Sequence, residues 1–300
     1  MTNYNCHSEI CDSRRAVLRC LEDGRTVQVS SFGMEDFGRS SSVKNFSFTG
    51  CIDEESDQAS FYEQCGVSGL ISKALDGYSA TLFAYGQTGS GKTYSVSGAE
   101  HVIVDEDYTG GDPREGVIPR AARQIYQAVQ EGSGGVSYSV KAACFEIYNE
   151  QVIDLLNPDA GQLAIRESKA QGFFVENLVV VDCQGVADLM EVFKEGTRNR
   201  HVGAHTMNRD SSRSHSLLVL YVDSTRTDAE TGEEVKRFGK LAFVDLAGSE
   251  RLKTSGSSGE MMKETGQINK SLFTLGKVIA SLYILVYICI LIYIHTYRYI

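Results

Sequence analysis

Residues 86–93 read Gly-Gln-Thr-Gly-Ser-Gly-Lys-Thr, a full match to the phosphate-binding pattern G-x-x-x-x-G-K-[ST]. Residues 80–85 before them, Ala-Thr-Leu-Phe-Ala-Tyr, are the apolar, aromatic and β-branched types expected of a buried strand. A strand, a glycine loop and a helix start are the context that this motif requires, because backbone N–H groups then surround a polyphosphate. In that context Lys92 reaches the β- and γ-phosphates, and the Thr93 hydroxyl binds Mg²⁺. The alternative is a glycine turn that binds nothing.

Two further motifs follow in the order that a nucleotide site needs. Residues 240–250 form a short apolar strand that ends in Asp245 and continues as D-x-x-G. An aspartate at the end of a strand beside the phosphate loop can hold the Mg²⁺ shell, and Gly248 can offer its N–H to a γ-phosphate. Residues 208–215, Asn-Arg-Asp-Ser-Ser-Arg-Ser-His, bring hydroxyls, two arginines and a histidine together. Alone, these segments could be a turn and a helix cap, but with the loop they predict a nucleotide site with two switch segments.

The three motifs together resemble those of the kinesin motor domain. Residues 85–93 are similar to the phosphate loop of that family, residues 208–215 to its switch I, and residues 245–250 to its switch II. Residues 145–156 resemble the strand-to-helix segment between them, and residues 268–276 resemble the start of the helix that faces the microtubule. The resemblance covers about residues 14 to 282 and leans toward the kinesin-twelve type.

The resemblance implies ATP hydrolysis with Mg²⁺ and movement along microtubules. The implied nucleotide contacts are Gly86, Gln87, Thr88, Gly89, Ser90, Gly91, Lys92, Thr93 and Tyr94. The implied Mg²⁺ ligands, partly through water, are Thr93, Ser212 and Asp245. Arg213 and Glu250 are expected to form a salt bridge that closes the switches around the attacking water, while Gly248 senses the γ-phosphate. Asn208 and His215 are expected to fix the switches, and Tyr94 either packs against the base or is ordinary core.

Composition agrees with a single large domain or two small ones, since the chain has 300 residues and 42% hydrophobic content. Its eight cysteines are scattered without a metal-ligand spacing, which favours thiols in a reducing compartment and makes the cytosol the default location. A net charge of −10 argues against nucleic acid as a partner.

Microtubule binding by so acidic a chain needs a local basic patch. The candidates follow switch II, where basic residues cluster with a few acidic ones among them: Arg251, Lys253, Lys263, Lys270 and Lys277. In the family this stretch is the loop and helix that touch tubulin, so the resemblance implies a microtubule- and cytoskeleton-associated protein of the cytoplasm. The alternative is a solvated face of mixed charge.

The pattern along the chain predicts an α/β fold, with a mostly parallel or mixed sheet and helices on both faces. Expected elements are a hairpin at 15–29, strands at 44–48, 80–85, 138–147, 217–222 and 240–245, and helices at 61–75, 119–131, 186–200 and about 264–282. Residues 97–116 are expected to be a surface loop.

Both ends depart from the family pattern. The Arg-x-Arg-Pro strand that lines the adenine pocket in kinesins is absent, as is everything that follows the switch II helix, so residues 1–282 are expected to be a partial motor domain. The first and last central strands are then missing, which leaves the phosphate-loop strand as an exposed edge, and we expect poor folding. Residues 283–300, rich in Ile and Tyr, are translated non-coding sequence, a membrane tail anchor or an alternative isoform. The alternative function is a non-motile fragment that binds nucleotide or tubulin.

Overall fold

The computed structural model describes residues 16–31, 42–52, 55–105, 108, 110–132, 135–169, 172–206, 211–227, 231–250 and 260–281. The chain divides into two compact units, of which the smaller includes the strands before residue 53 and the larger the elements from residue 55 onward. The Ile- and Tyr-rich segment 283–300 lies outside the described residues. Within the described residues, no helix is long and apolar enough to cross a membrane.

The smaller unit is a three-stranded antiparallel sheet. Its strands are β1 (Ala16–Cys20), β2 (Thr26–Ser31) and β3 (Ser42–Ser47), in that order. The turn between β1 and β2 is fixed by Asp23, whose carboxylate accepts hydrogen bonds from the Arg25 and Thr26 backbone N–H groups at 2.9 and 2.8 Å. Gly24 follows with a φ of 62°, a left-handed conformation that glycine adopts without strain. The predicted hairpin with an Asp-Gly turn is therefore confirmed.

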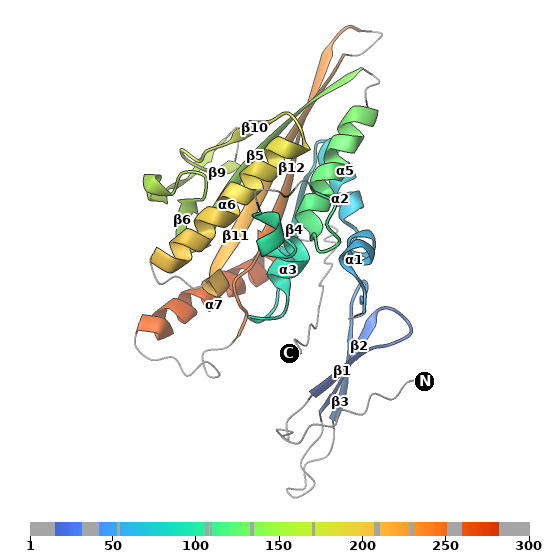
Figure 1. The fold of residues 1–300 in the computed structure, drawn as a ribbon, viewed down its shortest axis with the longest axis vertical. Helices are drawn as coiled ribbons and strands as arrows, with labels where there is room; N and C mark the ends of the chain where they lie inside the picture. Colours follow the sequence, from blue (N-terminus) through green and yellow to red (C-terminus); the bar gives the residue numbers. More distant parts are fainter. Residues whose placement is uncertain are drawn as a thin grey trace, which may run out of the picture. The chain divides into compact units, whose positions relative to one another are not determined.

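The larger unit is built on a mixed sheet (Figure 1). Its strands in spatial order are β4 (Ser79–Ala84), β12 (Glu234–Asp245), β11 (Ser214–Thr227), β5 (Val136–Tyr148), β6 (Gln151–Asp154) and β7 (Gln162–Leu163), with β10 (Val181–Cys183) also on β5. Within the described pairs only β4 and β12 are parallel. A separate hairpin consists of β8 (Ile165–Ser168) and β9 (Gly172–Val175). Of the two predicted arrangements, mostly parallel or mixed, the chain has the mixed one.

Helices cover both faces of this sheet, as predicted. They are α1 (Gln58–Gln64), α2 (Val67–Leu75), α3 (Lys92–Val96), α4 (Glu100–Ile103), α5 (Val117–Glu131), α6 (Val186–Thr206) and α7 (Glu260–Ser281). Side chains alternate along β12, so Phe243 packs with residues of α5 and α6, while Ala242 and Val244 belong to a cluster that includes Leu272 and Leu275 of α7. Helices α5 and α6 therefore lie on one face and α7 on the other.

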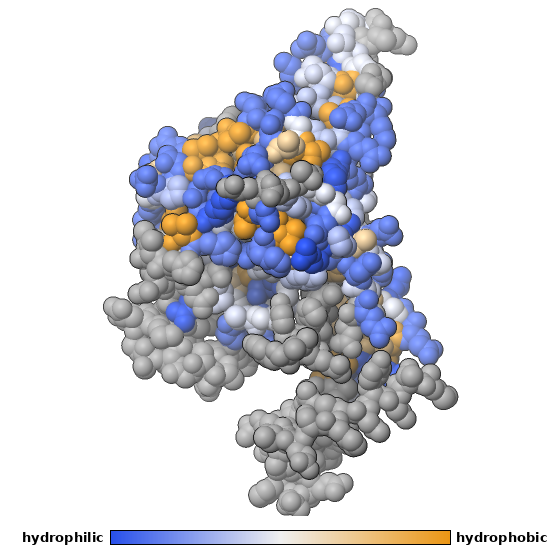
Figure 2. Space-filling model, viewed as in Figure 1, coloured by the Kyte–Doolittle hydropathy of each residue, from blue (hydrophilic) through white to orange (hydrophobic). Residues whose placement is uncertain are grey.

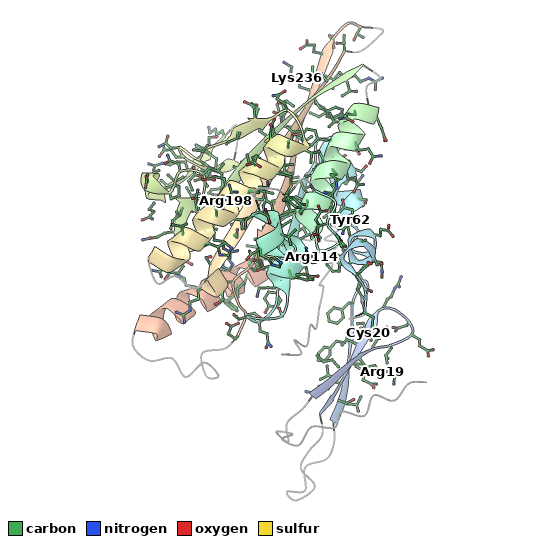
Figure 3. All side chains as sticks on the ribbon, in the orientation of Figure 1. Arg19, Cys20, Tyr62, Arg114, Arg198 and Lys236 are labelled. Atoms are coloured by element: carbon green, nitrogen blue, oxygen red, sulfur yellow. The ribbon has the colours of Figure 1, made fainter. Side chains whose placement is uncertain are left out.

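Two helix and loop predictions need correction. The helix expected over 61–75 is two helices, because Gly66 between α1 and α2 has a φ of 76°. Residues 97–116 are not simply a surface loop: they contain α4, and Arg198 of α6 holds them through the Val104 carbonyl at 3.2 Å (Figure 3). Glu115, near the end of this segment, is completely buried.

The strand before the phosphate loop is less buried than its sequence predicts. None of the residues of β4 is fully buried, and Thr81 is exposed. The reason is its position, since β4 pairs with β12 on one side and has no described strand on its other side. Among the described strands, β4 is therefore an edge, as predicted. On the face drawn in Figure 2, hydrophilic residues surround separate hydrophobic patches of the larger unit.

The Glu115 carboxylate ties the 97–116 segment to α5. It accepts hydrogen bonds from Arg123 Nη1 at 3.0 Å and the Gly111 backbone N–H at 2.6 Å, and also from Tyr108 Oη and Arg123 Nη2. Burial alone would raise the pKa of Glu115, but the hydrogen bonds from Arg123 and Tyr108 outweigh it and lower the pKa below 4.5. The buried carboxylate is therefore held in its charged form.

We expect Glu115→Gln to destabilise the larger unit by about 2 kcal/mol, less than for a fully buried pair because Arg123 is partly exposed. Urea denaturation at pH 7 measures the change. Since the folded state lowers the pKa of Glu115, the stabilisation is present above the unfolded pKa and is lost as the pH falls through the folded one, so parent and variant should converge in acid. The exposed Glu131→Gln, at the end of α5, is the matched control, and equal losses in the two variants would contradict this assignment.

Candidate nucleotide site

The phosphate loop, residues 86–93, has the strand–loop–helix geometry that its sequence predicts. It leaves the end of β4 and enters α3, where Gly91 is the N-cap with a φ of 88°. Gly89 is also left-handed, with a φ of 77°. A Cβ atom at Gly86 would lie 2.5 Å from Ser90 Oγ. Glycine is thus required at these positions by backbone conformation or by space.

Lys92 begins α3 and turns back over the loop. Its Nζ donates a hydrogen bond to the Gln87 carbonyl at 3.0 Å. Burial lowers the pKa of Lys92, and the nearby carboxylates of Asp245 and Glu250 oppose that change. A half-desolvated ammonium group within this loop favours an anion as its further partner.

Thr93 and Asp245 meet at the C-terminal end of β12. Thr93 Oγ1 donates to Asp245 Oδ2 at 2.6 Å, so the structure brings together two of the three predicted Mg²⁺ ligands. Asp245 Oδ1 is buried and has no hydrogen-bond partner among the described residues. A hydroxyl and a buried carboxylate oxygen are the hard donors that Mg²⁺ and its water shell prefer, so these residues fit the ion. Ser212 is the third predicted ligand, and its carbonyl accepts from the Gly248 N–H at 2.8 Å.

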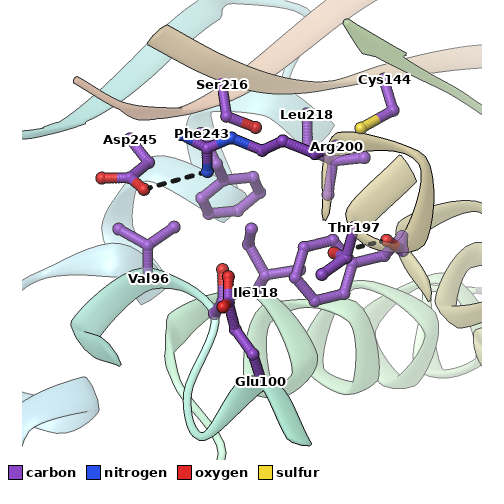
Figure 4. Close-up of a pocket in the computed structure, with 12 residues that line it drawn as sticks. Val96, Glu100, Ile118, Cys144, Thr197, Arg200, Ser216, Leu218, Phe243 and Asp245 are labelled. Carbon is purple, nitrogen blue, oxygen red and sulfur yellow. Dashed lines mark hydrogen bonds and ion pairs between the residues drawn. The ribbon is translucent and has the colours of Figure 1, made fainter. Parts of the chain in front are cut away.

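Sequence reasoning missed Arg200, which lies in the middle of this site. It extends from α6, and its Nη1 is 3.4 Å from Asp245 Oδ2, while Nη2 donates to the Ser214 carbonyl at 3.3 Å. Figure 4 shows Arg200 and Asp245 at the wall of a small pocket that Phe243 and Thr197 also line. In the sequence Arg200 is one of several charged residues near the end of a helix, and only its contact with Asp245 in the folded chain identifies it.

We expect Arg200→Leu to lower the free energy of unfolding by about 3 kcal/mol, because the variant leaves the buried Asp245 carboxylate without its cation. Urea denaturation of Arg200→Leu, of Asp245→Asn and of the double variant measures the coupling energy between the two side chains. The double variant should recover part of the loss. Strictly additive losses would contradict a direct Arg200–Asp245 interaction.

Switch II, residues 245–250, lies against both the phosphate loop and switch I. The Ser249 N–H donates to the Gly86 carbonyl at 3.0 Å. The Glu250 carboxylate accepts from the Thr88 N–H at 3.0 Å and from Thr88 Oγ1 at 2.6 Å. Burial would raise the pKa of Glu250, but the hydrogen bonds from Thr88 outweigh it and the pKa is lowered. A Cβ atom at Gly248 would collide with the Glu250 carboxylate and with Thr88 Oγ1.

The predicted salt bridge between Arg213 and Glu250 is not the contact that Glu250 makes in this structure. Its carboxylate is on Thr88 instead, across the phosphate loop. Arg213 lies in the 3₁₀ turn Ser211–Arg213 that precedes β11. The Arg213–Glu250 bridge stays a prediction for a state in which the switches close.

His215 joins switch I to two other elements. Its Nδ1 accepts from the Ala247 backbone N–H at 3.0 Å, and its Nε2 is 2.8 Å from Ser271 Oγ on α7. Only 8% of the residue surface is exposed, and burial lowers the pKa of His215. The expected switch-fixing role thus has specific partners.

The remaining predicted site residues have few described contacts or lie outside the described residues. Tyr94 is half-buried on α3, its carbonyl accepting from Gln58 Nε2 at 2.7 Å, and a base-packing role is untested. Lys270 and Lys277 are exposed on α7, Lys270 Nζ being 4.0 Å from Glu150 Oε2 and Lys277 Nζ 4.5 Å from the centre of the Phe273 ring. Outside the described residues or side chains lie Asn208, Arg251, Lys253 and Lys263.

The five cysteines described on the two units form no disulfide with one another, in agreement with the prediction of thiols. They are Cys20, Cys51, Cys65, Cys144 and Cys183.

Comparison with known proteins gives consistent results. A family model described as the kinesin motor domain matches residues 7–284. Kinesin-like protein KIN-12D of Arabidopsis thaliana is 40% identical over 250 residues, which are 82% of this chain and 8% of that protein. Kinesin heavy chain of Syncephalastrum racemosum is 37% identical over 219 residues, 73% of this chain and 22% of that protein. A solved structure of a fast kinesin matches with a TM-score of 0.75 and 33% identity over 90% of this chain and 70% of that one.

Proposed function

The chain belongs to the kinesin motor domain family, and we propose that it hydrolyses ATP with Mg²⁺ and binds microtubules as the motor part of a longer protein. It spans only 8% and 22% of the two curated relatives above, and the identity with KIN-12D supports the leaning to the kinesin-twelve type. The observation that best supports the proposal is the convergence of three separate segments. Thr93 and Thr88 of the phosphate loop contact Asp245 and Glu250 of switch II, and Gly248 contacts the Ser212 carbonyl of switch I.

The phosphate loop is proposed to bind the nucleotide through residues 86–93, with Tyr94 beside the base. Lys92 leaves the Gln87 carbonyl and places its ammonium on the β- and γ-phosphates. Thr93 and Asp245, with Ser212, hold Mg²⁺ directly or through water. The ion, when bound, neutralises charge on the phosphates as it develops in the transition state. Arg200 keeps the Asp245 carboxylate oriented toward that position.

The two switches are proposed to close on the attacking water. Glu250 exchanges its Thr88 contact for Arg213, which encloses the reaction and strengthens its electrostatics. Gly248 offers its N–H to the γ-phosphate, and Asn208 helps to hold switch I. Phosphate release then relaxes both switches, and α7 moves with switch II.

The track-binding surface is proposed to run from the segment after switch II into α7. Its basic residues are Arg251, Lys253, Lys263, Lys270 and Lys277. The exposed positions of Lys270 and Lys277 on α7 support this assignment. A chain of net charge −10 needs such a local patch to approach an acidic filament, and the proposed location is the microtubule cytoskeleton of the cytoplasm.

Phosphate release measured with and without microtubules tests the proposal. A motor accelerates on the track, by about 100-fold or more for a change of about 3 kcal/mol in the barrier. A non-motile fragment that binds nucleotide or tubulin stays at the unstimulated rate, and a chain that binds neither contradicts both alternatives. Direct titration with MgADP separates a non-motile fragment that binds nucleotide from a chain that does not.

A further inference from the structure

Among the described residues, the side chain of His215 makes a polar contact between a switch segment and α7. It follows the 3₁₀ turn of switch I, at the start of β11. One ring nitrogen contacts the backbone of switch II at Ala247, and the other contacts the side chain of Ser271. A single imidazole therefore touches both an element that reads the nucleotide and the helix that packs on the opposite face of the sheet from α5 and α6.

The direction of the Ala247 bond fixes the state of the ring. A backbone N–H can only donate, so Nδ1 of His215 must be an unprotonated acceptor. The remaining proton of the neutral imidazole is then on Nε2, which donates to Ser271 Oγ. A charged ring would carry two N–H groups and lose the Ala247 bond. The burial of His215, which lowers its pKa, agrees with the neutral ring.

The other described contacts between α7 and the sheet, apolar packing and a long ion pair, are less directional than the His215–Ser271 hydrogen bond. Leu272 and Leu275 pack on the apolar cluster around Ala242 and Val244, and such a surface tolerates sliding of the helix. The ion pair between Lys270 and Glu150 is long, at 4.0 Å, and both side chains are largely exposed. The His215–Ser271 hydrogen bond, by contrast, is short and buried at the His215 end, so it sets where α7 sits relative to switch II.

We propose that His215 is a positioning residue that transmits the position of switch II to α7 through its two hydrogen bonds, to Ala247 and to Ser271. This inference rests on the proposed function, since it requires switch II to respond to nucleotide. Any displacement of Ala247 must either carry Ser271 with it or break one of the two bonds. The link thus couples nucleotide state to the helix independently of the apolar packing.

Three variants isolate the link. His215→Asn keeps an acceptor near the Nδ1 position and removes the reach to Ser271, whereas His215→Gln keeps a donor near the Nε2 position. Ser271→Ala removes the acceptor on α7. Thr274→Ala on the same helix is the matched control, because the described hydrogen bond of its hydroxyl goes to the Lys270 carbonyl within α7.

Hydrogen exchange of the full chain, with Mg²⁺ and either ADP or a non-hydrolysable ATP analogue, reports the phosphate loop and α7 separately. In the parent and in Thr274→Ala, exchange in α7 should differ between the two nucleotides by about fivefold, the change expected from one hydrogen bond. In His215→Asn and in Ser271→Ala that difference in α7 exchange should disappear while the phosphate loop still responds to nucleotide. The double variant with both changes should exchange in α7 like either single variant.

Three results would overturn the inference. The first is a nucleotide response of α7 that survives in His215→Asn and Ser271→Ala. The second is a parent chain in which the loop responds and α7 does not. Both leave the proposed function intact. The third is a chain in which neither segment responds to nucleotide, and this result removes the proposed function together with the inference that rests on it.

Discussion

Replacing Lys92 with alanine should reduce ATP hydrolysis by about a thousandfold, the size expected when a charge that stabilises the transferred phosphoryl group is removed. Lys92 Nζ contacts the loop carbonyl of Gln87, within a loop whose glycines allow a phosphate to approach. Single-turnover phosphate release measures the rate, and titration with MgADP measures the affinity, which should fall as well.

Stability distinguishes this loss from simple unfolding. Burial lowers the pKa of Lys92, so its ammonium is not favoured where it lies, and the alanine variant should melt within about 2 °C of the parent. Lys236→Ala, near the tip of β12 and labelled in Figure 3, is the control and should leave hydrolysis unchanged. Hydrolysis within tenfold of the parent in Lys92→Ala would contradict the proposed site.

Replacing Gly248 with alanine should slow hydrolysis by about a hundredfold and change nucleotide affinity by no more than about threefold. The added methyl group would collide with the Glu250 carboxylate and Thr88 Oγ1. Relief of the collision requires the Glu250 and Thr88 side chains to move, which breaks the hydrogen bonds between switch II and the phosphate loop. The variant therefore keeps the phosphate loop and places a methyl group where switch II must approach it.

The comparison variant is Gly203→Ala, in α6, where an added Cβ meets nothing within 4 Å. It should hydrolyse ATP at the parent rate, and better helix propensity should preserve or raise its stability. Equal rates in Gly203→Ala and Gly248→Ala would show that switch II closure does not limit the reaction. A fall in ADP affinity as large as the fall in rate would instead place Gly248 in nucleotide binding.

The sequence predicts those parts of the molecule whose conformation is determined by neighbouring residues in the chain. The glycines of the phosphate loop, the Asp23 turn and the strand that ends in Asp245 follow from backbone conformation and from short-range pattern, and the structure has all three. The α/β class with helices on both faces also follows from the alternation of strand and helix patterns, but that alternation left a mostly parallel and a mixed sheet equally open.

The parts that the sequence does not predict depend on contacts and backbone angles that the local pattern of residues does not reveal. Arg200 is 45 residues from Asp245, and Glu115 looks like an ordinary loop residue until Arg123 and Tyr108 enclose it. The contact of Glu250 with Thr88 spans 162 residues. Gly66 reads as a tolerated helix glycine, but its positive φ ends α1 and starts α2 in a new direction.

The open side of β4 has a thermodynamic consequence for the nucleotide site. This strand leads directly into the phosphate loop and is supported laterally by β12 alone among the described strands. Any segment that pairs with the open edge would restrict the end of the strand from which the loop begins, and would thereby favour the bound conformation of the loop. By reciprocity, a nucleotide bound in the loop would strengthen edge pairing by the same factor as edge pairing strengthens nucleotide binding. A nucleotide bound there would then also promote assembly at this edge, and a paired strand would act as an effector of the loop.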